Sequence, residues 1–219
     1  MNLVTDLFPA ADEFSDRHVN AALSAVRQAL ESGDRSNLTN EQRGLVERMD
    51  QASTKIASGA ELSRISELMS LAQFGAGSIG LAVADACRDD RARQACEALF
   101  VTRFLIVAIL GAGASANLIP GDLLRRNELD RKDISWPAAK PIYDALLGRA
   151  TQTLEIDYGN EIGATAPFLR KYIRIQRALA AKHIRKLEGR DPSSRRARLT
   201  ALDRFLVSLR ILLRLEGAP

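Results

Sequence analysis

The chain has 219 residues, of which 46% are hydrophobic and 26% are charged, and this composition excludes a chain that is disordered throughout. Only 5% of the residues are aromatic, which favours helices over a sandwich or barrel rich in β-branched and aromatic residues. Residues 1–120 hold 11 Lys or Arg and 15 Asp or Glu, whereas residues 121–219 hold 20 and 12, so the net charge of +4 arises entirely in the second part. We expect a single all-α domain over residues 1–219 with about eight helices.

The first two helices are marked by capping residues. Apolar residues recur at helical spacing from His18 to Ser32, with Asp16 as the expected N-cap and Gly33 as the expected end. Thr39 and Gln42 form the T-x-x-Q pattern of a capping box, which predicts the start of a second helix.

Glycines and a long apolar run characterise the next part of the chain. A third helix is expected to begin near Ala60 and to be interrupted by the glycines of FGAGSIG, residues 74–80. A fourth helix is expected over residues 91–110, and it should be the most buried because it is apolar on more than one face. The uncharged run over residues 104–119 is shorter than the roughly 20 residues that a membrane span needs, so we interpret it as part of this buried helix and a following turn.

Proline and hydroxyl residues mark the starts of the later helices. Proline suits the first helical turn because its missing N–H would have no partner there. The expected starts are Pro120 for a short helix, Ser135 or Pro137, Thr165 or Pro167, and Ser193 or Ser194 for the last helix.

Two features bear on the location of the protein. The two cysteines, Cys87 and Cys96, cannot form a disulfide framework. The N-terminus carries acidic residues where a secretory signal has basic ones. We expect a cytoplasmic protein, and the basic C-terminal part suggests a peripheral contact with a membrane as an alternative.

Residues with metal-binding or phosphate-binding patterns are sparse. His18 and His183 are far apart in the sequence, and neither has a Cys or His at metal-binding spacing, so no structural zinc site is predicted. FGAGSIG has the glycine spacing of a dinucleotide fingerprint but follows no predicted strand, and close helix packing explains it better. Asp85 and Asp89 are spaced i, i+4 and could share a divalent ion, although a polar helix end accounts for them more simply.

Four segments after residue 73 together resemble one protein family. FGAGSIGLAVADAC is similar to a helix with the pattern V-A-G-x-V-G, and LIPGDLLRRNELDRKDI is similar to a segment with Y-L-P-x-D-x-L. ATAPFLRKYIRIQRALAAKHIRKLEGRDP and RRARLTALDRFLVSLR are similar to two later helices of the same proteins. The family is that of the squalene/phytoene synthases, all-helical enzymes that join two prenyl diphosphates head to head. The resemblance implies an isoprenoid-synthase-like helical bundle over residues 74–219 and leaves residues 1–70 without a counterpart.

The chain departs from the family where the family binds magnesium and diphosphate. In the family, the motif N-x-L-x-R-D-x-x-x-D precedes Y-L-P, and counting back from Pro120 places its two aspartates at Val107 and Gly111. Neither residue has a side chain that can ligate a metal, and the family reaction needs a metal to neutralise the leaving pyrophosphate. The resemblance therefore implies a shortened, degenerate relative: a non-catalytic protein that binds an isoprenoid or lipid, or an accessory protein.

The resemblance also suggests where a ligand would bind. No cofactor is expected, but magnesium would be needed if the chain is instead a divergent isoprenyl diphosphate transferase or lyase. The residues expected to take part are Gly77, Gly80, Val107 and Gly111 around an apolar pocket, Arg170, Lys171 and Arg174 on a diphosphate, and Asp85 and Asp89 on the metal of an active enzyme.

Three kinds of partner remain open from the sequence. The first is an isoprenoid or lipid ligand, and the second is a protein partner. The third is a polyanion, either an acidic membrane surface or nucleic acid, bound by the basic residues of the C-terminal helices. Nucleic acid ranks lower because the chain has no helix-turn-helix signature and few aromatic residues for base stacking.

Overall fold

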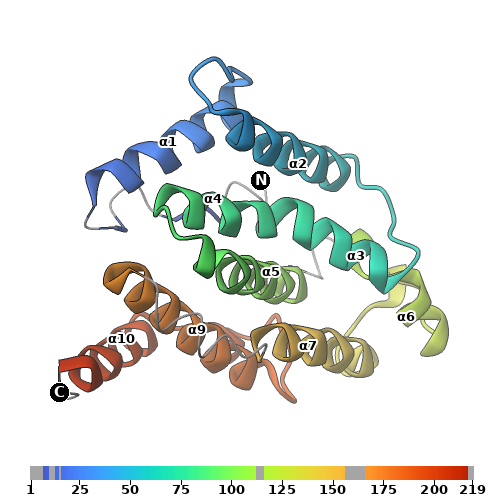
Figure 1. Cartoon of the computed structure of the whole chain (residues 1–219). Helices are drawn as coiled ribbons and strands as arrows, with labels where there is room; N and C mark the ends of the chain where they lie inside the picture. The colour runs from blue at the N-terminus through green and yellow to red at the C-terminus, as the bar shows by residue number, and fades with distance from the viewer. Residues whose placement is uncertain (1–6, 10–12, 15, 112–115, 156–165, 217–219) are drawn as a thin grey trace.

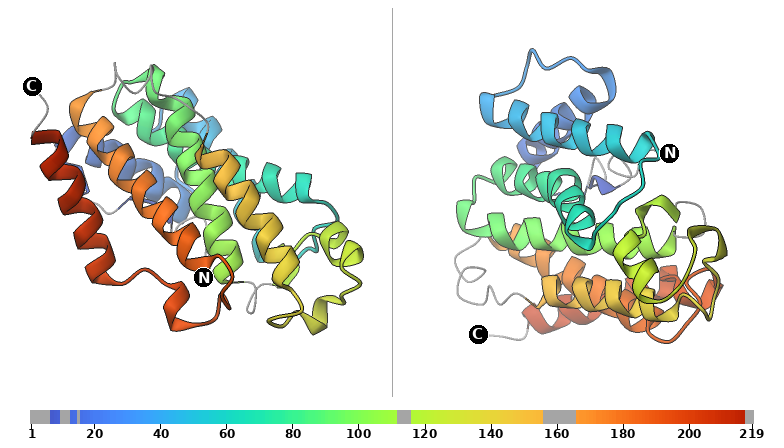
Figure 2. Two further views of the ribbon diagram at one scale, coloured as in Figure 1. Left: turned by 90° about the horizontal axis from the view of Figure 1, so that it is seen from below. Right: turned by 90° about the vertical axis from the view of Figure 1, so that its right-hand side faces the viewer.

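The computed structural model describes residues 7–9, 13–14, 16–111, 116–155 and 166–216, with side chains up to residue 211 in the last helix. Figures 1 and 2 show that the helices lie in three layers, and the described residues contain no strand. The predicted all-α fold is therefore confirmed for the described residues.

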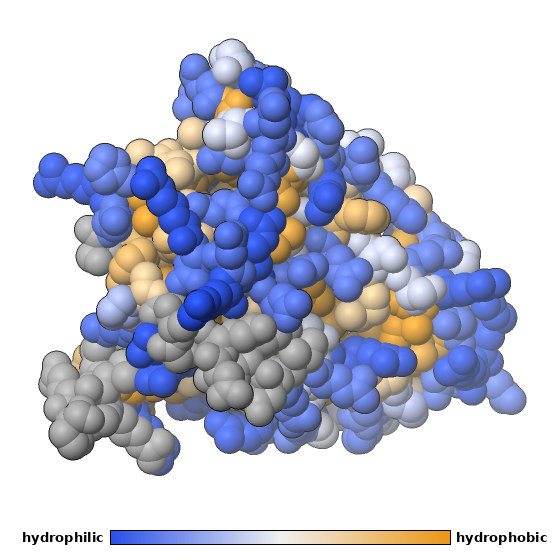
Figure 3. Space-filling view, in the orientation of Figure 1, coloured by the Kyte–Doolittle hydropathy of each residue, from blue (hydrophilic) through white to orange (hydrophobic). Residues whose placement is uncertain are grey.

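The first layer is a pair of helices, α1 (Arg17–Ser32) and α2 (Asn40–Ala57). The Asp16 carboxylate accepts a hydrogen bond from the backbone N–H of His18, and Gly33 ends α1 in the left-handed conformation. Thr39 and Gln42 form the predicted capping box at the start of α2. Both helices bury one face against the second layer and, in the view of Figure 3, present mainly hydrophilic side chains to the outside.

The second layer contains the core of the molecule. α3 (Ile65–Ala72), a π-helical turn (Gln73–Gly77) and α4 (Ser78–Ala86) form one continuous helix that packs on α5 (Arg93–Leu110). α5 lies between the other layers and buries residues all around its circumference, as predicted. By length and composition, Ile65–Ala86 is the one helix in the described chain that could cross a membrane, but 67% of its apolar window is buried in the fold.

Two predictions for this layer were wrong. The third helix begins at Ile65, not near Ala60, and its first turn is capped by the Asp122 carboxylate, which accepts from the N–H of Ile65 at 3.3 Å. The glycines of FGAGSIG do not interrupt the helix; the backbone continues through them in the π-helical turn. Tertiary packing overrides the low helix propensity of glycine here because α4 and α5 approach each other closely.

The third layer covers the opposite side of α5. It contains α7 (Lys140–Leu154), α9 (Pro167–Leu187) and α10 (Ala201–Glu216), while the short α6 (Gly121–Arg126) packs against the start of α3. The predicted start at Thr165 lies outside the described residues. The last helix begins at Ala201, later than predicted, because Arg195–Ala197 form a separate 3₁₀ turn with Ala197 buried and Arg198 is extended.

Candidate functional site

A cavity of about 410 Å³ lies where the N-terminal segment, α5, α9 and the beginning of α10 meet. One part of its wall is apolar, and the other carries charged and polar groups. It is lined by Leu7, Glu13, Arg103, Ile106, Val107, Gln176, Leu179, Ala180, His183, Leu199 and Arg204.

The polar part of the wall is rich in nitrogen donors. The guanidinium of Arg103 lies over the Phe100 ring, 4.9 Å from its centroid. Arg103 Nη1 and His183 Nε2 are buried, and within the described structure neither has a hydrogen-bond partner. Because buried polar atoms are normally satisfied, two unpartnered ones at one cavity point to a ligand or to ordered water that hydrogen-bonds with them.

Burial sets the charge state of His183. The pKa of the imidazole is lowered to about 4, mainly by desolvation. A hydrogen bond with the backbone of Ala197 raises the pKa in part, and the positive charges of Arg204 and Lys186 lower it. His183 is therefore neutral at physiological pH, and the positive charge at the cavity comes from Arg103 and Arg204.

Glu13 is the one carboxylate among the lining residues that the structure describes. Its Oε1 accepts a hydrogen bond from Gln176 Nε2 at 2.9 Å, which links the N-terminal segment to α9. With two arginines and a single carboxylate, the lining favours an anionic group.

The predicted pocket residues fall in two different places. Val107 lines the cavity, and Gly111, one turn later, ends α5. Gly77 and Gly80 instead lie at the contact between the continuous helix and α5. A Cβ added to Gly80 would lie 2.4 Å from the backbone oxygen of Cys96, so this glycine permits helix contact and leaves no room for a ligand at that point.

The predicted diphosphate ligands Arg170, Lys171 and Arg174 lie in the first turns of α9. Arg170 is half-buried, whereas Lys171 and Arg174 are exposed. The cavity is lined by later turns of α9, from Gln176 to His183. The structure thus does not bring these three side chains to the cavity that Val107 lines.

The predicted metal ligands Asp85 and Asp89 have different partners. Asp85 accepts a hydrogen bond from Arg93, whose Nη1 also lies 2.9 Å from Glu41 Oε1, and Asp89 Oδ2 accepts from the backbone N–H of Ala166 at 2.9 Å. Arg93 thus supplies the positive charge beside Asp85, whereas Asp89 is bound to the backbone of a different segment. Among the described residues no group of three or more His, Cys, Asp or Glu could hold a metal, and Asp85 and Asp89 are bound to different partners.

Sequence reasoning did not assign Arg103 or His183 to a site. Gln176, Leu179, Ala180 and His183 follow the i, i+3, i+4, i+7 spacing of one helix face, and this pattern could have been found. The tertiary structure, however, determines which face of α9 packs toward α5. It also determines that this face lies at the same cavity as Arg103.

A solved structure described as a dehydrosqualene synthase in complex with a ligand has a TM-score of 0.70 to this chain, with 11% sequence identity. The match covers 99% of this chain and 91% of the other chain. No family model matches the sequence, and no curated protein matches it significantly. At this identity the likeness concerns the fold alone: the chain has the all-helical, isoprenoid-synthase-like fold that its sequence resemblance implied.

Proposed function

We propose that this protein binds an amphipathic isoprenoid or lipid with an anionic group in the cavity between α5 and α9, and that it does so without chemical conversion. The observation that carries the proposal is the lining of the cavity. Val107, which stands at a family metal-binding position, faces a cavity whose charged groups are mainly cationic.

The two parts of the wall suit the two parts of such a ligand. Leu179 and Val107, with their apolar neighbours, offer a surface for a hydrocarbon chain. Arg103 and Arg204 offer donors and positive charge for a phosphate or carboxylate, and the unpartnered Nη1 of Arg103 is available to it among the described groups.

The same lining argues against the family reaction. Ionisation of a prenyl diphosphate requires a metal held by several carboxylates, which neutralises the departing pyrophosphate. Arginines can bind the diphosphate, but they supply neither a metal nor an acid of suitable pKa to the leaving group, so the bond between the diphosphate and the prenyl chain stays intact. The lining therefore favours retention of the ligand over turnover.

The binding test uses farnesyl diphosphate and the intact chain, with affinity measured by calorimetry. Leu179→Phe fills part of the cavity and is expected to weaken binding at least tenfold, whereas Leu30→Phe, a half-buried position on α1, is the matched control. Arg204→Gln is expected to weaken the binding of farnesyl diphosphate but not that of farnesol. Arg125→Gln, on the exposed side of α6, is its control. Equal affinity of all variants would refute the cavity as the binding site.

The catalytic test is an incubation of the protein with magnesium and farnesyl or geranylgeranyl diphosphate, followed by measurement of pyrophosphate release. We expect no sustained release. Turnover that disappears in Asp85→Ala or Asp89→Ala would establish the alternative, a divergent magnesium-dependent enzyme, and would reject the non-catalytic proposal.

A further inference from the structure

The outer face of α10 is an exposed apolar stripe. Its four residues are spaced i, i+3, i+4 and i+7, so they lie along one side of the helix. We call this surface the α10 stripe: Leu202 is 64% exposed, Phe205 61%, Leu206 47% and Leu209 38%. They are four of the five large hydrophobic residues that are exposed in the described chain, and the fifth, Phe74, lies in the second layer.

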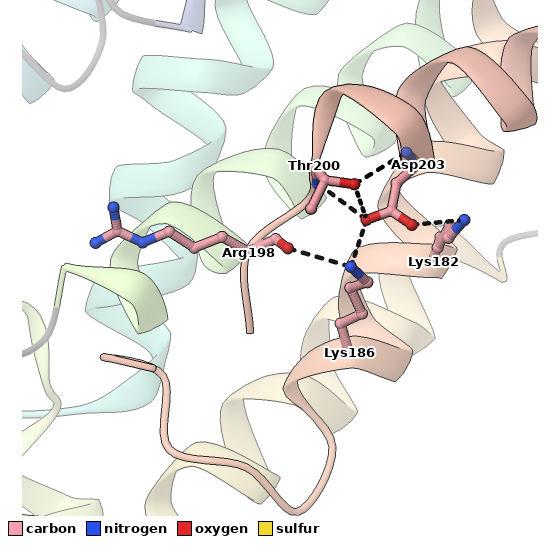
Figure 4. A network of polar contacts seen from close by, with 5 residues as sticks. All are labelled: Lys182, Lys186, Arg198, Thr200 and Asp203. Carbon is pink, nitrogen blue, oxygen red and sulfur yellow. Dashed lines mark hydrogen bonds and ion pairs between the residues drawn. The ribbon is translucent and has the colours of Figure 1, made fainter. Parts of the chain in front are cut away.

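The opposite face of α10 is firmly attached to α9. Figure 4 shows Asp203 between two lysines of α9: Lys182 Nζ lies 2.9 Å from Asp203 Oδ1, and Lys186 contacts Oδ2. Val207 and Ile211 are half-buried on the same side. This attachment fixes the rotation of α10, which lies at the outer edge of the molecule (Figure 2, left), and leaves the stripe exposed.

A basic hollow lies at the start of α10. Its volume is about 510 Å³, and its walls are formed by Lys186, Arg190, Arg195, Arg196 and Thr200. Residues 185–210 contain eight Lys or Arg and three Asp or Glu, of which Asp203 is already paired with lysines. Thr200 directly precedes α10, so the basic hollow lies at the N-terminal end of the helix that carries the α10 stripe.

We propose that the α10 stripe and the basic hollow together dock this protein on the surface of an anionic lipid membrane. An amphipathic helix lies in the plane of a membrane with its apolar face among the acyl chains, and neighbouring arginines bind the headgroups. Leu202, Phe205 and Leu206 supply the apolar face, while Arg195 and Arg196 supply the charge. The lipid phosphate is the anion that matches the hollow.

Charge favours a membrane over the other occupants of this surface. A second copy docked through α10 by a twofold axis would present the same charged surface to itself, and the like charges of the two basic hollows would oppose the contact. Nucleic acid would use the arginines but has no counterpart for four exposed aliphatic and aromatic side chains in a row. Of these occupants, only a lipid surface would contact both the α10 stripe and the basic hollow.

The test is flotation of the full chain with vesicles of phosphatidylcholine alone or of phosphatidylcholine and phosphatidylglycerol in a 3:1 ratio. We expect binding to the anionic vesicles that weakens with salt and little binding to the neutral ones. Leu202→Ser/Phe205→Ser should reduce binding to the anionic vesicles at least tenfold, and Phe74→Ser is the matched control for an exposed apolar residue. Arg195→Gln/Arg196→Gln should reduce it about thirtyfold, with Arg125→Gln/Arg126→Gln on α6 as the control.

Three results would overturn the inference. The first is the absence of the chain from anionic vesicles. The second is a loss of binding in the arginine variant but not in the Leu202→Ser/Phe205→Ser variant, which would indicate adsorption by charge alone. The third is a dimer in sedimentation equilibrium that Leu202→Ser/Phe205→Ser abolishes, since a second copy would then cover the stripe.

This inference is independent of the proposed cavity function, and the variants separate the two. Leu179→Phe should leave vesicle flotation unchanged, whereas Leu202→Ser/Phe205→Ser should leave the affinity for soluble farnesyl diphosphate unchanged. Because the substituted stripe residues are exposed, their variants should retain the helical circular dichroism and the melting temperature of the parent chain.

Discussion

Arg93 connects three helices through one guanidinium group. It stands at the start of α5, and its Nη1 contacts Glu41 of α2 and Asp85 of α4. Burial raises the pKa of the Asp85 carboxyl, and the positive charge of Arg93 partly offsets this effect. Asp85, which the sequence suggested as a metal ligand together with Asp89, thus helps to join three helices.

Removing this arginine should leave Asp85 without its counter-charge. We expect Arg93→Met to lower the free energy of unfolding by about 1–3 kcal/mol at pH 7. The loss should shrink toward pH 4, because the raised pKa of Asp85 then allows the carboxyl to take a proton in the folded state. Urea denaturation at both pH values measures this effect, and Arg93→Met/Asp85→Asn should recover part of the loss. Equal losses at both pH values, with no recovery in the double variant, would contradict this role for Arg93.

His183 should make stability depend on pH. Its pKa is lowered to about 4 in the folded chain, against about 6.5 in the unfolded chain. Between these values only the unfolded state takes up the proton, so the contribution of His183 is present above pH 6.5 and is lost as the pH falls toward 4. Between pH 7.5 and pH 5, the free energy of unfolding should therefore fall by about 1 kcal/mol less in His183→Gln than in the parent chain, a value reduced to allow for the partial exposure of the side chain. Urea titrations of His183→Gln, with His18→Gln on the exposed first turn of α1 as control, provide the measurement.

At the level of helices, the contact between α4 and α5 depends on Gly80. A Cβ at this position would collide with the backbone of Cys96, which cannot move without shifting α5. We therefore expect Gly80→Ala to lower the free energy of unfolding by about 3 kcal/mol, measured by thermal or chemical denaturation. Gly44→Ala in α2, where the Cβ meets nothing within 4 Å, should instead stabilise by about 0.5–1 kcal/mol. Similar effects of the two alanines would show that the close contact is absent in solution.

The attachment of α10 depends on Asp203. Its hydrogen bonds with Lys186, with the backbone of Thr200 and with Lys182 hold the pKa of its carboxyl well below the usual range. The attachment should therefore persist at neutral pH and weaken only in strong acid. Asp203→Asn should increase hydrogen exchange of the α10 amides at pH 7, while Asp144→Asn, at an exposed pair on α7, should leave it unchanged. Protection of α10 that is equal in the two variants would contradict this account.

The start of α10 also shows what a sequence can and cannot predict about an element. Thr200 and Asp203 form a reciprocal cap in which each side chain accepts from the backbone N–H of the other residue. This T-x-x-D pattern was present in the sequence, and it is a better start signal than Ser193 or Ser194. Asp16, Thr39 with Gln42, and Pro167 were read correctly because their signals are local.

At the level of the whole molecule, periodic apolar residues and local caps were enough to predict the fold class and the central place of α5. The site was less accessible because it depends on long-range contacts. The family resemblance predicted Val107 for an apolar pocket, but Arg103 and His183 are 80 residues apart in the sequence and no local pattern links them. The roles of Arg170 and of Asp85 depend on which neighbour each side chain meets, and no local pattern encodes that.

The contacts between the N-terminal segment and α9 can form only late in the synthesis of the chain. Phe14 packs on the ring of Tyr172 with 4.7 Å between centroids, and the hydrogen bond of Glu13 with Gln176 spans 163 residues of sequence. At a synthesis rate of roughly 5–20 residues per second, the first residues leave the ribosome on the order of ten seconds before α9 exists to receive them. Until then Phe14 lacks the rings of Phe168 and Tyr172 against which it packs, and the cavity lacks the wall that α9 provides. The cavity is therefore complete only after α9 has been synthesised, and a nascent chain that stops before α9 leaves Phe14 without its partner rings.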